Sequence, residues 1–115
     1  MKILIVDDNA DDRRLLKYIV ERKGHEAIEA RDGLEGLRMA KISLPDLIIS
    51  DALMPLMDGF QFLRCVREDL NLSSTPFIFY SATYVPTYLA YSPFASTSSA
   101  LFLRIARPSG KTIIS

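Results

Sequence analysis

Three aspartates stand directly after two apolar runs that have the pattern of buried strands. Asp7 and Asp8 follow the run 3–6, and Asp51 follows the run 47–50. Carboxylates held close together repel one another unless a cation neutralises their charge. A small set of oxygen ligands suits Mg²⁺, which keeps several waters and leaves positions open for phosphate oxygens. The residue types and their spacing therefore indicate a Mg²⁺ site that admits a phosphate group.

Whether these acids meet depends on the strands that carry them. Residues 1–80 alternate strand and helix patterns, which is typical of a doubly wound α/β sheet with parallel strands and right-handed crossovers. Such a sheet binds ligands outside the carboxyl ends of its strands. With the first strand beside the third, the acids share one cleft, to which Ser81, at the end of the fourth apolar run, adds a hydroxyl. A single acid at a strand end is often an ordinary solvated loop residue, but this combination on neighbouring strands indicates a site.

Hydrophobic spacing predicts the individual elements of the first 80 residues. Apolar runs predict strands over 3–6, 25–30, 47–50 and 76–80, and helical spacing predicts helices over 10–23, after Asp32 and from Phe60 onward. Asp32 is the expected N-cap of the second helix, and Gly24 the expected C-terminal cap of the first. The residues expected to face the core are Leu15, Leu16, Ile19 and Val20 on the first helix, Leu34, Leu37 and Ala40 on the second, and Phe60, Leu63, Val66 and Leu70 on the third.

The pattern weakens beyond Tyr84. Residues 87–95 are the expected fourth helix, although prolines fit it poorly, and residues 100–105 are the expected fifth strand. A proline and a glycine then stand where a fifth helix would run, so that helix is expected to be short, atypical or missing.

The formal net charge of zero is the sum of two unlike segments. Residues 1–84 hold 11 basic and all 14 acidic side chains, whereas residues 85–115 hold three basic side chains and no acid. A balanced charge argues against broad electrostatic attraction to nucleic acid or to an acidic membrane surface.

The uncharged stretch between Leu70 and Leu103 does not have the pattern of a membrane helix, because prolines and many Ser and Thr residues interrupt it. The first apolar run is too short for the core of a signal peptide. The single cysteine, Cys65, excludes a disulfide framework and is expected to be a half-buried thiol on the third helix. These features predict a cytoplasmic protein.

Four motifs in register resemble the receiver domain of two-component response regulators. They are Val6-Asp7-Asp8-Asn9, the run Asp46-Leu47-Ile48-Ile49-Ser50-Asp51, the run Met54-Pro55-Leu56-Met57-Asp58-Gly59, and Ser81-Ala82. The resemblance implies one receiver domain over residues 1–115, typical over 1–84 and divergent over 85–115. Its fold would be flavodoxin-like, a (βα)5 arrangement around a parallel five-stranded sheet.

The same resemblance implies a role for each residue of the site. Asp51 would be the phosphoacceptor, taking a phosphoryl group from the phosphohistidine of a sensor histidine kinase or a phosphotransfer protein. Asp8 and Asp51 would ligate Mg²⁺ directly, with the backbone carbonyl of Leu53 as a third protein ligand. Asp7 would act largely through water, and Ser81 would donate a hydrogen bond to a phosphoryl oxygen.

The resemblance also implies a signalling switch rather than an enzyme that turns over an independent substrate. Its output would pass to a downstream protein whose identity the sequence does not reveal, and a homodimer stays open as a further partnership. No nucleic acid and no membrane are expected to bind this domain.

One family residue has no counterpart in this chain, the Lys at the end of the fifth strand that pairs with the phosphate. Arg104 lies at roughly that position, and Arg107 precedes Pro108 in the family's basic-Pro order. Either could supply the charge, although Arg and Lys differ in reach and geometry. The alternative function is therefore a receiver-fold interaction module with impaired phosphorylation.

Two other classes of acidic site fit the sequence less well. A haloacid-dehalogenase-like phosphatase needs a second Asp two residues after its nucleophile, where this chain has Leu53. An EF-hand loop beginning at Asp7 would need a bidentate Glu where this chain has Tyr18.

Overall fold

Strands and helices alternate over residues 1–81, as the hydrophobic spacing predicted. The computed structural model describes residues 1–81, 100–102 and 112–113. The strands are β1 (Lys2–Val6), β2 (Glu26–Ala30), β3 (Leu47–Asp51), β4 (Phe77–Ser81), β5 (Ala100–Phe102) and β6 (Thr112–Ile113). The helices in the described ranges are α1 (Ala10–Arg22), α2 (Gly33–Ser43) and α3 (Gly59–Glu68). None of these helices is long and apolar enough to cross a membrane.

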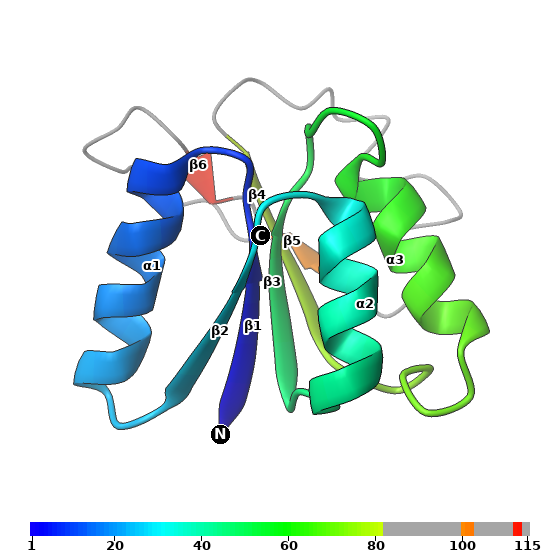
Figure 1. The fold of residues 1–115 in the computed structure, drawn as a ribbon, viewed down its shortest axis with the longest axis horizontal. Helices are drawn as coiled ribbons and strands as arrows, with labels where there is room; N and C mark the ends of the chain where they lie inside the picture. Colours follow the sequence, from blue (N-terminus) through cyan, green and yellow to red (C-terminus); the bar gives the residue numbers. More distant parts are fainter. Residues whose placement is uncertain (82–99, 103–111, 114–115) are drawn as a thin grey trace.

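The first five strands form a parallel sheet in the order β2-β1-β3-β4-β5 (Figure 1). α1 covers one face of this sheet, while α2 and α3 lie side by side on the other. The register aligns Ile5 with Ile49 and Ile49 with Ile78. The C-terminal ends of these three neighbouring parallel strands therefore lie at the same edge of the sheet. The predicted doubly wound, flavodoxin-like sheet is confirmed, and β1 lies beside β3 as the convergence of the acids requires.

The C-terminal part of the sheet differs in detail from the prediction. β5 is shorter than the run 100–105 that was expected to form it. β6 pairs antiparallel with the end of β4, where Ser81 lies opposite Thr112. This strand was not predicted, because two residues are too few to show a period in the sequence. The expected fourth helix, over 87–95, and the region of the fifth helix apart from β6 lie outside the described residues.

Alternation along the strands divides the core into two layers. Leu4 and Val6 of β1 pack on the side of the sheet that α2 and α3 cover. Ile3 and Ile5 pack on the opposite side with Leu16 of α1. These four β1 side chains are at most 3% exposed, so the strand is buried on both faces, as its continuous apolar run predicted.

The ends of the first two helices follow from local chemistry. The Asp32 side chain accepts a hydrogen bond from the backbone N–H of Glu35 at 2.8 Å, which confirms Asp32 as the N-cap of α2. Leu44 adopts a left-handed conformation (φ 47°) and ends α2 immediately before Pro45. Gly24, at φ 86°, follows α1 in the left-handed region, as predicted.

Three of the side chains predicted to face the core do not. Leu70, Leu34 and Ile19 are 93%, 54% and 42% exposed. Because α3 ends at Glu68, Leu70 lies beyond the helix, and the fully buried Phe62 contributes the aromatic side chain that α3 packs against the sheet. Helical spacing alone does not show which of two adjacent stripes faces the sheet, nor where the helix ends.

Arg67 shapes the connection from α3 to β4. Its Nη1 donates hydrogen bonds to the carbonyls of Leu72 at 3.3 Å and Thr75 at 2.8 Å. Burial lowers the pKa of the Arg67 guanidinium, which nevertheless stays protonated at neutral pH. The bond to Thr75 fixes the backbone shortly before β4 begins.

Phe62→Ala should lower the free energy of unfolding by about 3–5 kcal/mol, because it removes a fully buried aromatic side chain and leaves a cavity. Leu70→Ala is the matched control and should change the free energy of unfolding by less than about 0.5 kcal/mol, since its side chain is 93% exposed. Urea denaturation of both variants beside the unsubstituted chain measures the difference. Equal effects of the two substitutions would contradict this assignment of the core.

Candidate functional site

The three predicted acids converge at the carboxyl edge of the sheet. One oxygen each of Asp7, Asp8 and Asp51 can be chosen so that all lie within 4.8 Å of one another. Asp7 is fully buried and Asp51 is 3% exposed, whereas Asp8 is open to solvent. The site therefore combines two carboxylates removed from water with a third at the surface.

In the loop after β1, a single residue, Asn9, both holds the Asp7 carboxylate and caps the start of α1. The backbone N–H of Asn9 donates to Asp7 Oδ1 at 2.9 Å. The side chain of Asn9 caps α1 by accepting a hydrogen bond from Asp12 N at 3.0 Å. The N-terminus of α1, where the helix dipole favours negative charge, thus begins two residues after Asp8.

Arg13 lies behind Asp7 and was not singled out from the sequence. Its Nη1 donates to the Asp7 carbonyl at 2.7 Å, and its Nε donates to Glu29 Oε1 at 3.2 Å. The Arg13 side chain is 15% exposed, so its charge is held in place by these two contacts. The only signal for this contact in the sequence was an arginine in the first turn of the helix that follows Asp7 and Asp8.

Tyr80 is a second residue that the sequence analysis missed. Its hydroxyl donates a hydrogen bond to Asp7 Oδ2, and both residues are fully buried. The available signal was a tyrosine as the last residue of the apolar run 76–80. In the sequence this residue is indistinguishable from an ordinary core aromatic of β4.

The loop between β3 and α3 holds the Asp51 carboxylate at close range. The backbone N–H of Leu53 donates to Asp51 Oδ1 at 3.3 Å. Leu56 adopts a left-handed conformation (φ 69°) at the turn of this loop. Asp58 then caps α3 in a reciprocal arrangement with Gln61, whose side chain accepts from the Asp58 N–H at 3.0 Å.

Gly59 has to be a glycine because the backbone of β3 passes directly beside it. A Cβ at this position would overlap the carbonyl oxygen of Asp51 and lie 2.8 Å from Cε1 of Phe79. The Gly59 N–H donates to the Ala52 carbonyl at 3.0 Å, which closes the loop. The requirement for glycine at position 59 thus has a steric cause, and it concerns the backbone of Asp51 directly.

The hydroxyl of Ser81 and the arginine predicted to replace the family's Lys lie outside the part of the chain that the structure describes. The backbone of Ser81 ends β4, but the structure describes nothing of its side chain. Arg104 and Arg107 both lie outside the described residues. Their roles, like that of the Leu53 carbonyl, stay predictions.

The acidic cluster suits a hard divalent cation. Its donors are carboxylate oxygens alone, and the exposed Asp8 leaves one side open to water and to further oxygen ligands. Mg²⁺ binds proteins through one or two carboxylates while keeping waters and phosphate oxygens as its other ligands. The residues present therefore fit Mg²⁺ and an anionic group beside it.

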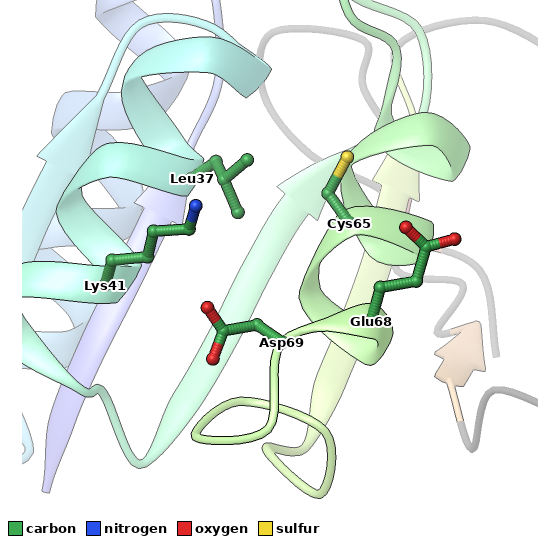
Figure 2. Close-up of a pocket in the computed structure, with 5 residues that line it drawn as sticks. All are labelled: Leu37, Lys41, Cys65, Glu68 and Asp69. Carbon is green, nitrogen blue, oxygen red and sulfur yellow. The ribbon is translucent and has the colours of Figure 1, made fainter.

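A separate hollow lies between α2 and α3, away from the acids. This cavity of about 260 Å³ is lined by Leu37, Lys41, Cys65, Glu68 and Asp69 (Figure 2). Cys65 is partly exposed there, in agreement with the half-buried thiol predicted from the sequence. The lining of this cavity carries charges of both signs around one thiol. The carboxylates that could bind a cation together lie at the acidic cluster of Asp7, Asp8 and Asp51, not in this cavity.

Fold and site together define a doubly wound α/β domain that presents an acidic cluster at the carboxyl edge of a parallel sheet. The family model for the response regulator receiver domain matches residues 3–91. The chain belongs to this family.

Individual relatives support the assignment. The chain is 42% identical over 67 residues to the alkaline phosphatase synthesis transcriptional regulatory protein PhoP of Bacillus subtilis, covering 58% of this chain and 28% of PhoP. It is 35% identical over 77 residues to protein PilH of Pseudomonas aeruginosa, covering 67% of this chain and 64% of PilH. Each match thus spans less than two thirds of the relative.

Solved structures show the same fold. The chemotaxis protein CheY4 of Vibrio cholerae superposes with a TM-score of 0.76 at 31% sequence identity, covering 86% of this chain and 80% of that one. The receiver domain of a signal transduction histidine kinase from Syntrophus aciditrophicus superposes with a TM-score of 0.71 at 36% sequence identity. The superposition covers 79% of this chain and 69% of that one.

Gly59→Ala should lower the free energy of unfolding by about 2–3 kcal/mol, since the added Cβ overlaps the Asp51 carbonyl and forces the β3 backbone to move. Gly24→Ala is the control: nothing lies within 4 Å of a Cβ there, so only the left-handed backbone adds a penalty, of about 1–2 kcal/mol. Thermal or urea unfolding compares the two. A Gly59 variant more stable than the Gly24 variant would contradict the steric role.

Proposed function

We propose that this chain is a phosphoacceptor switch of two-component signalling. Asp51 takes a phosphoryl group from the phosphohistidine of a sensor histidine kinase or of a phosphotransfer protein and becomes an acyl phosphate. The observation that carries the proposal is the placement of Asp51, 3% exposed at the end of a central strand, with one oxygen within 4.8 Å of oxygens from two other aspartates.

The proposed cofactor is Mg²⁺. Asp8 and Asp51 are its proposed direct ligands, with Asp7 acting through water and the Leu53 carbonyl as a further ligand. The support for this assignment is the oxygen-only donor set, two buried carboxylates and one exposed. When bound, the cation supplies neutralisation of the phosphoryl oxygens.

The chain's own residues orient the reacting group. An Asp51 oxygen bonds to phosphorus as the phosphorus–nitrogen bond of the phosphohistidine breaks, and the electron pair of that bond stays with the imidazole nitrogen. Phosphoryl transfer depends on in-line positioning and charge stabilisation rather than on a strong base. The Leu53 N–H, bonded to Asp51 Oδ1, supports such positioning.

Two further residue roles belong to the proposal. Ser81 donates a hydrogen bond to a phosphoryl oxygen, so the end of β4 responds to phosphorylation. Arg104 or Arg107 supplies the positive charge that the family's Lys provides elsewhere. Both roles rest on the match of this sequence to the family motifs.

The proposed organisation is one receiver domain over residues 1–115, acting in the cytoplasm without independent substrate turnover. Its partners are a kinase or phosphotransfer protein and a downstream protein. The relatives bear names as different as a transcriptional regulatory protein and a polar-differentiation response regulator, so they suggest no single output.

A second candidate function is an interaction module of receiver fold with impaired phosphorylation. The pairing of β6 with β4 favours it, because that ladder includes the backbone of Ser81 and holds the end of the strand that should move. Phosphorylation in vitro separates the two candidates.

Incubation of the unsubstituted chain with Mg²⁺ and acetyl phosphate or phosphoramidate should add the mass of one phosphoryl group, measured on the intact protein. Asp51→Asn should remove the adduct, and so should chelation of the metal with EDTA. Asp11→Asn, which changes an exposed acid on α1, is the matched control and should keep it. An adduct that survives Asp51→Asn would refute the phosphoacceptor role, and absence of any adduct on the folded chain would favour the interaction module.

A further inference from the structure

We propose that Tyr80 is a positioning residue of the cation site, holding the Asp7 carboxylate through its hydroxyl. The inference rests on the proposed function, because it concerns the cation that Asp51 chemistry requires. It assigns a role in cation binding to a residue of β4 that has the sequence signature of an ordinary core aromatic.

The sheet register brings Tyr80 into line with the acids. Tyr80 of β4 is the register partner of Asp51 on β3, and Ser50 is the partner of Val6 on β1. The row through Asp51 therefore continues to Asp7, the residue after Val6. Because partners across parallel strands share a face, the Tyr80 side chain extends past the position of Asp51 to reach Asp7.

Both oxygens of the Asp7 carboxylate are engaged. Oδ1 accepts the Asn9 N–H at 2.9 Å, and Oδ2 accepts the Tyr80 hydroxyl. One donor comes from the loop that follows β1, the other from a strand two positions away in the sheet. Two donors from different segments fix the plane of a carboxylate that one donor alone would leave free to rotate.

The surroundings of Tyr80 make this contact rigid. Its ring belongs to the core layer formed with Ile5 of β1 and Leu16 and Val20 of α1, and it is fully buried. A hydrogen bond to a charged group in such a place is stronger than one at the surface. Partners that orient the ligands of a metal typically contribute about 10- to 100-fold to its affinity.

The position of Tyr80 gives the contact a further consequence. It immediately precedes Ser81, the proposed phosphoryl contact, on the same strand. A shift of β4 that follows phosphorylation would therefore act on Asp7 through the Tyr80 hydroxyl. The bond between Tyr80 and Asp7 thus couples cation binding to the state of β4.

Tyr80→Phe keeps the ring and removes the hydroxyl, and it should raise the Mg²⁺ dissociation constant about tenfold or more. Isothermal titration calorimetry on the full chain, without any phosphoryl donor, measures it. Tyr18→Phe is the matched control, because the Tyr18 hydroxyl accepts a hydrogen bond from Arg22 at the surface of α1, where Tyr18 is 58% exposed. This substitution should leave the constant unchanged.

A double-substitution cycle separates positioning from a merely structural role. In an Asp7→Ala background, Tyr80→Phe should change the Mg²⁺ dissociation constant by less than about twofold, because the partner is gone. A purely structural role would lower the stability of the fold and leave Mg²⁺ binding by the folded chain unchanged. An unchanged constant in Tyr80→Phe would overturn the positioning role and leave the proposed function intact. Failure of the unsubstituted chain to bind Mg²⁺ would overturn both.

If Tyr80→Phe does not fold, a probe that keeps the hydroxyl decides the matter. With 3-fluorotyrosine placed at position 80, the ¹⁹F resonance should move when Mg²⁺ is added, and it should not move in the Asp7→Ala background. A resonance unaffected by Mg²⁺ in the otherwise unsubstituted chain would overturn the inference.

Discussion

Two carboxylates removed from water beside a third form the constraint on which the rest of this structure depends. Asp7 and Asp51 are at most 3% exposed, and they offer oxygens within 4.8 Å of each other. An ionised carboxylate loses much of its hydration free energy on burial unless hydrogen bonds or opposite charges compensate. The compensating donors described here come from separate segments of the chain: the backbone amides of Asn9 and Leu53 and the hydroxyl of Tyr80. The acidic site thus ties together elements that are distant in sequence.

The opposite face of the sheet supports the same site by packing. A Cβ on Gly33 would lie 2.8 Å from Cγ of Met57, so the start of α2 is pressed against the loop that follows Asp51. Phe60, the second residue of α3, stacks on Phe79 of β4 with ring centroids 4.8 Å apart. The loop is held between these contacts, and they limit how far the Asp51 backbone can move.

The sequence predicts those parts of the site that depend on period and on chain order. The convergence of Asp7 and Asp51 was predictable because buried runs show where parallel strands end, and such strands end at a common edge. The contacts of Arg13 and Tyr80 were not, because each depends on how a side chain reaches another element. The prediction that Leu70 faces the core was wrong for a related reason, since helical spacing shows an apolar stripe but does not locate the end of the helix. The strand β6 is too short to leave any period.

β4 belongs both to the core and to the acidic site. Phe77 and Phe79 pack into the layer under α2 and α3, while Tyr80 packs into the layer under α1. The strand therefore contacts both layers of the core, and the Tyr80 hydroxyl connects it to Asp7 as well. A packed core responds to strain by shifting between discrete arrangements rather than by deforming continuously. In this fold, β4 connects the acidic edge of the sheet to both layers of the core.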